Sequence, residues 1–216
     1  MIRFGGRTDG GDGYLSHSER VGPAVLVLHE FFGLQPSFLT FADRLNASGF
    51  TVLVPDLYDG ALATTVDEAR ALAQGLDVDA TIKKLHAAAS FLTDNWHPRL
   101  GVIGFSLGAD FAFVLATQRA VEALVLYYGL GDLDADPGGW RVPTLGHFGA
   151  EDEWTPVALA EKTFAALEDG EADCELHVYQ DAGHWFANTS VPDAYRGEAA
   201  DAAFEATTEF LLHHLA

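Results

Sequence analysis

One five-residue turn, Gly104-Phe105-Ser106-Leu107-Gly108, constrains the fold of this chain more than any other stretch of its sequence. A short apolar run precedes the turn and an amphipathic segment, residues 109–118, follows it, so the local order is strand, tight turn, helix. The two glycines are needed because the strand and helix backbones nearly touch on either side of a strained serine. This pattern predicts a nucleophile elbow, which presents the Ser106 hydroxyl above a sheet edge and leaves the Leu107 N–H free to hold an oxyanion.

The rest of the chain alternates strand-like and helix-like segments. Residues 24–29 are apolar without a break, which is typical of a strand covered on both faces of a parallel sheet. A helix that starts at Pro36 and stops at Gly49, followed by a strand at 50–54, completes one βαβ unit. The other segments predict helices at 65–74, 78–93, 156–167 and 198–214, strands at 123–127, 144–148 and 174–179, and a turn at 10–13 between two weak strands.

This alternation predicts a single α/β domain over residues 1–216. Its sheet should be doubly wound and mostly parallel, with helices on both faces and right-handed crossovers. In such folds ligands bind at the carboxyl ends of the strands, so catalytic groups should directly follow strands.

Composition excludes several classes of partner. The 32 acidic and 12 basic residues give a net charge of −20, which opposes binding to nucleic acid or to anionic membranes and mildly repels anionic small molecules. Residues 1–13 are polar and rich in glycine, and no apolar run approaches the length of a membrane span. We expect a soluble, cytoplasmic monomer or small homo-oligomer, with its one cysteine, Cys174, in the core.

The partners of Ser106 should follow later strands in the order serine, acid, histidine. His184 lies in a loop after the last predicted strand, whereas the other late histidines lie inside strands or at a helix end, so His184 is the predicted base. Asp152 follows the preceding strand and is the preferred acid, because its carboxylate would fix the His184 tautomer. Another group of acids follows the strand one earlier and could also reach the histidine. These are Asp132, Asp134 and Asp136.

The same three aspartates are spaced like the start of a calcium-binding loop. Pro137 and Pro143, however, occupy the positions that such a loop reserves for glycine and for a bidentate glutamate. We therefore expect no metal, and we expect no cofactor. Apolar walls should surround an open site for a small substrate, because residues 55–77 are too few for a lid domain. The expected wall residues are Phe31, Phe32, Trp154, Trp185 and Phe186.

Six motifs together resemble the dienelactone hydrolase family (carboxymethylenebutenolidases) over nearly the whole chain from about Val25. Their joint spacing is far more specific than any single motif. They are Glu30-Phe31-Phe32-Gly33, Pro55-Asp56-Leu57-Tyr58, the elbow at 104–108, Tyr127-Tyr128-Gly129, His147-Phe148-Gly149-x-x-Asp152 and Ala182-Gly183-His184-x-Phe186.

The resemblance implies an α/β-hydrolase fold without a cap domain, a Ser106–His184–Asp152 triad and an oxyanion hole formed by the backbone N–H groups of Phe31 and Leu107. It also places Glu30 beside the nucleophile, where the family uses a glutamate to gate ionisation. The other interpretation of Glu30 is a solvated carboxylate at a strand end.

Two departures from the family pattern affect the expected substrate. Ser106 stands where the family usually has cysteine, and a serine hydroxyl must lose its proton to His184 during attack. Asn188 stands where the family has an arginine that binds the substrate carboxylate, and Arg70 or Arg196 would have to substitute for it. We therefore expect a serine hydrolase of a neutral ester, lactone or thioester. The alternatives are a non-catalytic small-molecule sensor on the same fold, and an acyltransferase or perhydrolase that uses the same triad.

Overall fold

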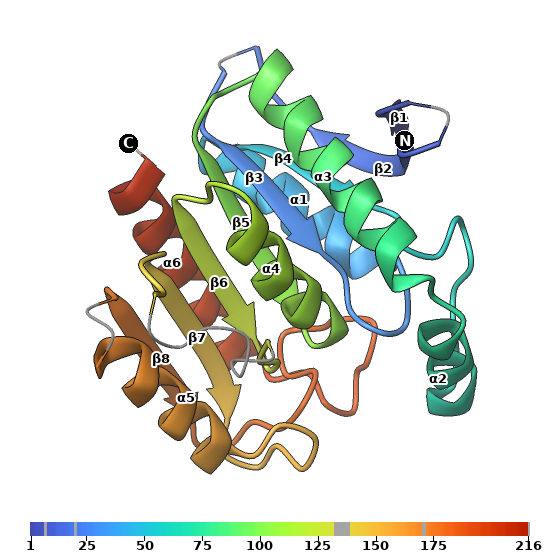
Figure 1. Ribbon diagram of the computed structural model, residues 1–216. Coiled ribbons are helices and arrows are strands. Elements are labelled where there is room, and N and C mark those ends of the chain that lie inside the picture. The colour runs from blue at the N-terminus through green and yellow to red at the C-terminus, as the bar shows by residue number, and fades with distance from the viewer. Residues whose placement is uncertain (7, 20, 132–138, 170–171, 216) are drawn as a thin grey trace.

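The structure is a computed structural model that describes all residues except 7, 20, 132–138, 170–171 and 216 (Figure 1). The described helices are α1 (Pro36–Ala47), α2 (Val66–Gln74), α3 (Val78–Asn95), α4 (Leu107–Gln118), α5 (Val157–Asp169) and α6 (Gly197–Leu215). The described strands are β1 (Ile2–Phe4), β2 (Gly11–Ser16), β3 (Ala24–Leu28), β4 (Thr51–Pro55), β5 (Leu100–Phe105), β6 (Ala123–Tyr127), β7 (Thr144–Gly149) and β8 (Cys174–Tyr179).

The described strands form one sheet in the order β1-β2-β4-β3-β5-β6-β7-β8. The pairings from β4 to β8 are parallel, whereas β1 pairs with β2 and β2 with β4 antiparallel. The predicted mostly parallel, doubly wound sheet is therefore confirmed. Its parallel strands all end at one edge, where β3, β5, β7 and β8 lead into the candidate site residues.

Helices cover both faces of the sheet, as Figure 1 shows: α3, α4 and α5 pack on one face, and α1 and α6 on the other. Alternate residues of β3 supply the two cores, with Leu26 on the α3 and α4 side and Val27 on the α1 and α6 side. Each such fully buried aliphatic side chain contributes about 1.5–3 kcal/mol relative to its exposed state. The continuous apolar run in the sequence is thus explained by a strand buried on both faces.

Local signals in the sequence set several element boundaries. Helix α1 begins at Pro36, and Gly49, two residues past its end, has a φ of 104°, a conformation that favours glycine. Helix α2 begins with the predicted capping box, in which Glu68 N donates to Thr65 Oγ1 and Thr65 N donates back to the Glu68 carboxylate.

One expectation for the edges of the sheet is wrong. Residues 11–13 belong to strand β2 rather than to a turn, because they pair with β1 and Gly13 also pairs with Pro55 of β4. Cys174 packs against the core as expected, but it is only partly buried because it starts β8, the strand at the opposite edge.

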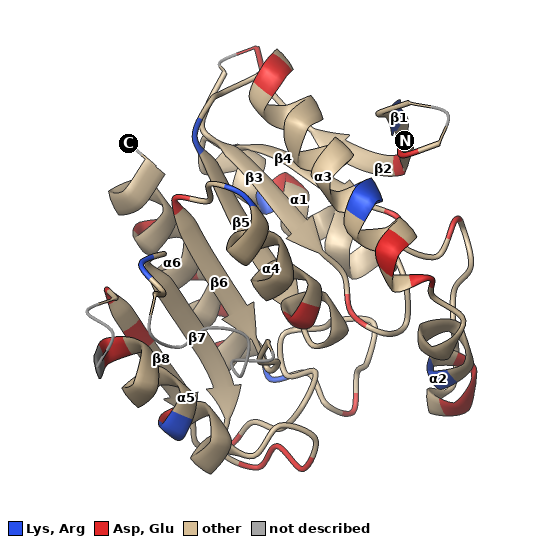
Figure 2. Cartoon of the chain, in the orientation of Figure 1, with Lys and Arg blue, Asp and Glu red and all other residues tan. Residues whose placement is uncertain are grey.

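Acidic residues far outnumber basic ones, 32 to 12, and Figure 2 shows their positions along the chain. Many of them lie in loops and helix ends, including the segment around Glu151 and Glu153 that follows β7. Within the described ranges, no helix combines the length and apolar character needed to cross a bilayer.

Candidate active site

Ser106 occupies a strained turn between β5 and α4. Its φ of 49° and ψ of −116° lie in a region that residues with side chains rarely adopt. The amide of Ser106 donates to Tyr127 O on the neighbouring strand β6 over 2.9 Å, which anchors the turn. A Cβ at Gly108 would lie 2.3 Å from Leu28 O, and one at Gly104 would lie 2.5 Å from the backbone of α4. The predicted elbow is therefore present, and its close packing explains both glycines.

The structure brings Ser106, His184 and Asp152 together from the ends of three different strands. Ser106 Oγ lies 2.8 Å from His184 Nε2, and His184 Nδ1 lies 2.8 Å from Asp152 Oδ2. Because the Asp152 carboxylate accepts from Nδ1–H, Nε2 of the neutral ring is left to accept the serine proton. This arrangement can deprotonate Ser106 during nucleophilic attack.

The loop after β7 holds the Asp152 carboxylate in place. Its second oxygen, Oδ1, accepts from the amides of Trp154 and Thr155, each at 2.8 Å. The side chain of Asp152 is fully buried and that of His184 is nearly so, so the pair has little exposure to solvent. The alternative acids and the calcium-like loop, at 132–138, lie outside the described residues.

Four aromatic rings form a continuous wall beside His184. Phe31 contacts Phe32 and Trp154, with ring centroids 5.5 and 5.9 Å apart. Trp185 closes the group against Phe32 at 5.4 Å and Trp154 at 5.3 Å, and both tryptophans also contact the His184 ring. Trp154 is 51% exposed although it lies against the candidate base, so it forms the open rim of this wall.

Phe186 does not belong to this wall, contrary to the expectation from the sequence. Its side chain is fully buried and packs on Tyr127, Tyr128 and Tyr179 in the core under α6. Phe186 is the second residue after His184 and faces the sheet, so it offers no surface to a substrate.

Glu30 and Asn188 form a buried polar cluster with Tyr128. Tyr128 Oη donates to Glu30 Oε2 over 2.9 Å, and Asn188 Nδ2 donates to Glu30 Oε1 over 2.6 Å. Burial raises the pKa of Glu30 to about 7, and the two neutral donors only partly offset that rise. Both Glu30 and Asn188 are buried, so neither contacts bulk solvent as a substrate-binding residue would. The solvated-carboxylate interpretation of Glu30 is therefore wrong.

Both candidate arginines are exposed and have other partners. Arg70 is exposed on α2 and forms an ion pair with Asp67. Arg196 is also exposed, and its guanidinium donates to the backbone carbonyls of Asp181, Asp193 and Tyr195. The polar side chain at the family's arginine position is thus Asn188, a neutral group already bonded to Glu30.

Sequence reasoning missed two residues of this region. Tyr128 lies between Glu30 and the His184 ring, whose centroid is 4.9 Å away, and the motif Tyr127-Tyr128-Gly129 was the available signal. His29 is fully buried directly before Glu30, and its apolar surroundings in the sequence gave no signal. His147, by contrast, is a hydrogen-bonded core residue, since both of its ring nitrogens have hydroxyl partners. Among the residues that the structure describes, no group of three metal-ligating side chains could hold an ion.

A family model and individual relatives both match this chain over most of its length. A model of the dienelactone hydrolase family matches residues 12–215. The carboxymethylenebutenolidase of Pseudomonas putida is 30% identical over 206 residues, which cover 88% of this chain and 85% of that protein. Carboxymethylenebutenolidase 1 of Cupriavidus pinatubonensis is 28% identical over 188 residues, or 79% of this chain and 78% of that one.

The fold is also found among solved structures. A dienelactone hydrolase-like promiscuous phosphotriesterase from metagenomic libraries superposes with a TM-score of 0.86 at 21% identity. The match covers 100% of this chain and 97% of that one. The predicted α/β-hydrolase fold is confirmed by this likeness.

Proposed function

The chain belongs to the dienelactone hydrolase family, and from that membership we propose that it is a serine hydrolase that cleaves a small ester, lactone or thioester through an acyl-enzyme on Ser106. The observation that carries the proposal is the unbroken hydrogen-bonded series from Ser106 Oγ through the His184 ring to Asp152. Each group can perform one role in acyl transfer, as nucleophile, base and orienting acid respectively.

In the first half-reaction, His184 Nε2 takes the Ser106 proton while Oγ forms a bond to the carbonyl carbon of the substrate. The carbonyl electron pair moves onto oxygen, and the resulting oxyanion is held by the amides of Leu107 and Phe31. Leu107 is the first residue of α4, so its N–H has no acceptor within the helix. The intermediate then collapses, the bond to the leaving oxygen or sulfur breaks, and the His184 proton passes to the leaving group.

In the second half-reaction, water repeats the attack on the Ser106 ester. His184 removes a proton from the water, the same two amides hold the second oxyanion, and the proton returns to Ser106 Oγ as the acid leaves. The side chain of Asp152 stabilises the imidazolium that forms in each step. If an alcohol replaced water as the acceptor, the same residues would perform acyl transfer. If hydrogen peroxide replaced it, they would perform perhydrolysis.

The surroundings of the serine favour a substrate without a carboxylate. Its aromatic wall presents apolar rings, and the one charged side chain in the Ser106–His184–Asp152 series is the Asp152 carboxylate. Relatives are named for carboxymethylenebutenolide, a substrate class that bears a carboxylate. Because Asn188 gives no positive charge here, we place neutral esters, lactones and thioesters ahead of that class.

Replacing the nucleophile tests this proposal. Ser106→Ala should lower turnover of short p-nitrophenyl esters on the order of a millionfold, because triad members act as a unit. The matched control is Ser190→Ala, an exposed serine whose side chain lies outside the triad and should leave turnover unchanged. Full esterase activity in folded Ser106→Ala would overturn the proposal, and a wild-type protein that binds but never turns over these esters would favour the sensor.

A further inference from the structure

His29 is buried at the end of β3, and backbone groups occupy both of its ring nitrogens. Leu57 N lies 3.0 Å from Nε2, and Glu30 O lies 2.7 Å from Nδ1. A backbone amide can only donate and a carbonyl can only accept, so Nε2 must be bare and Nδ1 must carry the proton. The geometry therefore fixes one neutral tautomer of His29.

The carbonyl held by His29 belongs to the peptide that joins Glu30 to Phe31. The same oxygen also accepts from Gly33 N over 3.1 Å, so two donors fix its direction. The described chain contains no cis peptide bond, and in a trans peptide the C=O and the following N–H point in opposite directions. Holding Glu30 O against the His29 ring thus fixes the direction of the Phe31 N–H.

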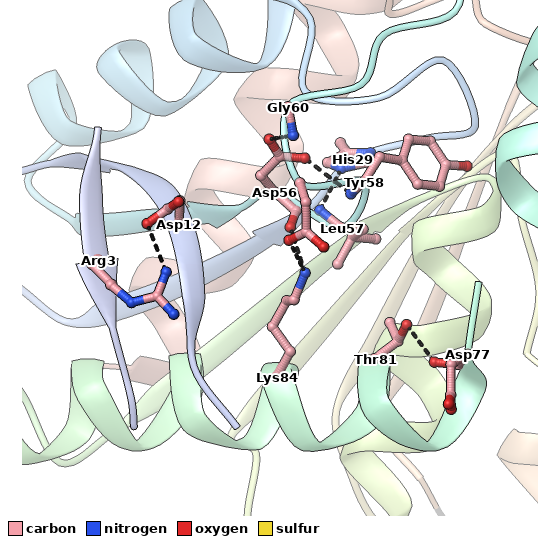
Figure 3. A network of polar contacts seen from close by, with 11 residues as sticks. Arg3, Asp12, His29, Asp56, Leu57, Tyr58, Gly60, Asp77, Thr81 and Lys84 are labelled. Atoms are coloured by element: carbon pink, nitrogen blue, oxygen red, sulfur yellow. Dashed lines mark hydrogen bonds and ion pairs between the residues drawn. The ribbon is translucent and has the colours of Figure 1, made fainter. Parts of the chain in front are cut away.

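The other side of the His29 ring rests on a loop that is itself well anchored (Figure 3). Asp56 Oδ1 accepts from Tyr58 N at 3.0 Å and its Oδ2 accepts from Gly60 N at 2.7 Å, which closes the loop after β4. Lys84 Nζ, on α3, donates to Asp56 O at 3.1 Å and to the Asp59 carboxylate. Leu57 N, the donor to His29, therefore lies in a loop whose position is fixed by the hydrogen bonds of Asp56 and Lys84.

We propose that His29 is a positioning residue for the hydrolysis. Its neutral ring links the Glu30–Phe31 peptide to the hydrogen-bonded loop at 56–60, and so directs the Phe31 N–H at the developing oxyanion. The inference rests on the proposed function, because it assumes that the Phe31 N–H is an oxyanion donor. It adds a residue that touches no substrate and whose effect should appear in the transition state alone.

Burial keeps the ring in the required form. It lowers the pKa of His29 to about 4, against the raising influence of its bond to the Glu30 carbonyl and of the Asp56 charge. A protonated ring would direct a second N–H at the Leu57 amide and lose that hydrogen bond. The ring therefore stays neutral at the near-neutral pH at which ester hydrolysis is measured.

A pair of substitutions separates the two hydrogen bonds. Asn places its amide nitrogen where Nδ1 lies and retains the donor to Glu30 O, whereas Gln places an acceptor where Nε2 lies and retains only the bond from Leu57 N. His29→Gln should lower kcat for p-nitrophenyl butyrate by roughly 10–100-fold, since loss of a whole oxyanion donor costs about 100–1,000-fold. KM should stay within about twofold, and the affinity for a phenylboronic acid, which forms a tetrahedral serine adduct, should fall by the same factor as kcat.

His29→Asn should retain most of kcat and of the boronic acid affinity, even if both variants lose similar thermal stability. Equal kcat in the two variants, or losses confined to KM or to the melting temperature, would overturn the inference. Wild-type protein that is inactive towards all esters would instead refute the proposed function. An active wild type with unimpaired His29→Gln would refute this inference alone.

A spectroscopic measurement on the wild-type protein covers the case in which neither variant folds. In protein labelled with ¹⁵N-histidine, the His29 ring should show a protonated Nδ1 and a bare Nε2 from about pH 5.5 to 8.5. The opposite tautomer, or titration within that range, would contradict the hydrogen bonds on which the inference stands.

Discussion

At the scale of single residues, the chemistry of Glu30 depends most on its neighbours. Its carboxyl is fully buried and accepts hydrogen bonds from two neutral donors, Tyr128 and Asn188, which only partly offset the rise in its pKa that burial causes. Burial also raises the pKa of the Tyr128 hydroxyl far above its ordinary value, with the Glu30 charge as the next cause, so Tyr128 remains a donor. This cluster lies directly against the His184 ring.

Glu30 should make the stability of the protein depend on pH. Its pKa rises from an ordinary 4.5 to about 7 on folding, so between these values the folded protein holds a proton that the unfolded chain releases. This contribution to the free energy of unfolding is complete below about pH 4.5, falls as pH rises to about 7, and amounts to something on the order of 3 kcal/mol. Urea unfolding of Glu30→Gln at pH 5 and pH 8 should lack this fall.

The exposed control Glu161→Gln should show the same dependence of the free energy of unfolding on pH as the wild type. The comparison between Glu30→Gln and wild type is needed because burial also lowers the pKa of His29 and of His147. Those two groups make the free energy of unfolding rise with pH at low pH, opposite to the effect of Glu30. A Glu30→Gln protein with an unchanged dependence on pH would show that Glu30 is ionised in the folded state.

At the scale of secondary-structure elements, the site depends on how closely α4 approaches β3. Gly108, in the first turn of α4, lies against the carbonyls of Leu28 and His29, so the elbow and the Phe31 segment share one contact. This contact brings Leu107 and Phe31, the two proposed oxyanion donors, to the same edge of the sheet. A larger residue at 108 would separate them.

Gly108→Ala should therefore damage both stability and turnover. The added Cβ would lie 2.3 Å from Leu28 O and 2.7 Å from His29 O, and such overpacking costs about 1–3 kcal/mol or more. Urea unfolding and ester hydrolysis should both be impaired. Gly75→Ala is the control, because its Cβ would meet nothing closer than 3.3 Å, at an ordinary φ of −81°. Wild-type stability and activity in Gly108→Ala would contradict the proposed close packing.

Elements with strong local signals could be predicted from the sequence, and those that depend on distant partners could not. Thr65 and Glu68 cap α2 within four residues, and the elbow around Ser106 has its strand and helix on either side, so both were predicted correctly. Strand β2 is rich in glycine and is defined by pairing with β4, about 40 residues later in the chain. Its extent is fixed by that pairing rather than by its own residues.

The candidate site shows the same difference between residues with a signal in the sequence and residues that depend on distant partners. Ser106, Asp152 and His184 could be predicted together because two rules apply to them: ligands lie at strand ends, and the triad follows the chain order serine, acid, histidine. Glu30 and Asn188 are separated by 158 positions, and nothing in either segment indicates that the two side chains are bonded. The face on which Phe186 lies is set by the loop after β8, which a count of residues from His184 does not determine.

At the scale of the whole molecule, charge should select among substrates. The net charge of −20 gives a repulsive field for anions, and the exposed acidic residues Glu151 and Glu153 flank the proposed acid in sequence. Arg70 and Arg196, the two candidates to replace the family's arginine, are engaged with Asp67 and with backbone carbonyls. We therefore expect the acidic field to disfavour a substrate that carries a carboxylate.

Two esters of similar length test this selectivity. The neutral p-nitrophenyl butyrate should be hydrolysed with a kcat/KM on the order of tenfold or more above that of mono-p-nitrophenyl succinate at low salt. Raising the ionic strength from about 0.01 to 0.15 M shortens the screening length from about 30 to 8 Å and should narrow the difference. Equal or faster hydrolysis of the succinate ester would reveal a cation in the site.

The central claim, that Ser106 is the nucleophile, is tested most directly by labelling it covalently. Purified protein treated with a fluorophosphonate should gain one adduct, and peptide mass spectrometry should locate it on Ser106, within the turn whose strained φ of 49° presents the hydroxyl to His184. Ser106→Ala should remain unlabelled. An adduct on any other residue, or an active protein that the reagent neither labels nor inhibits, would contradict the account.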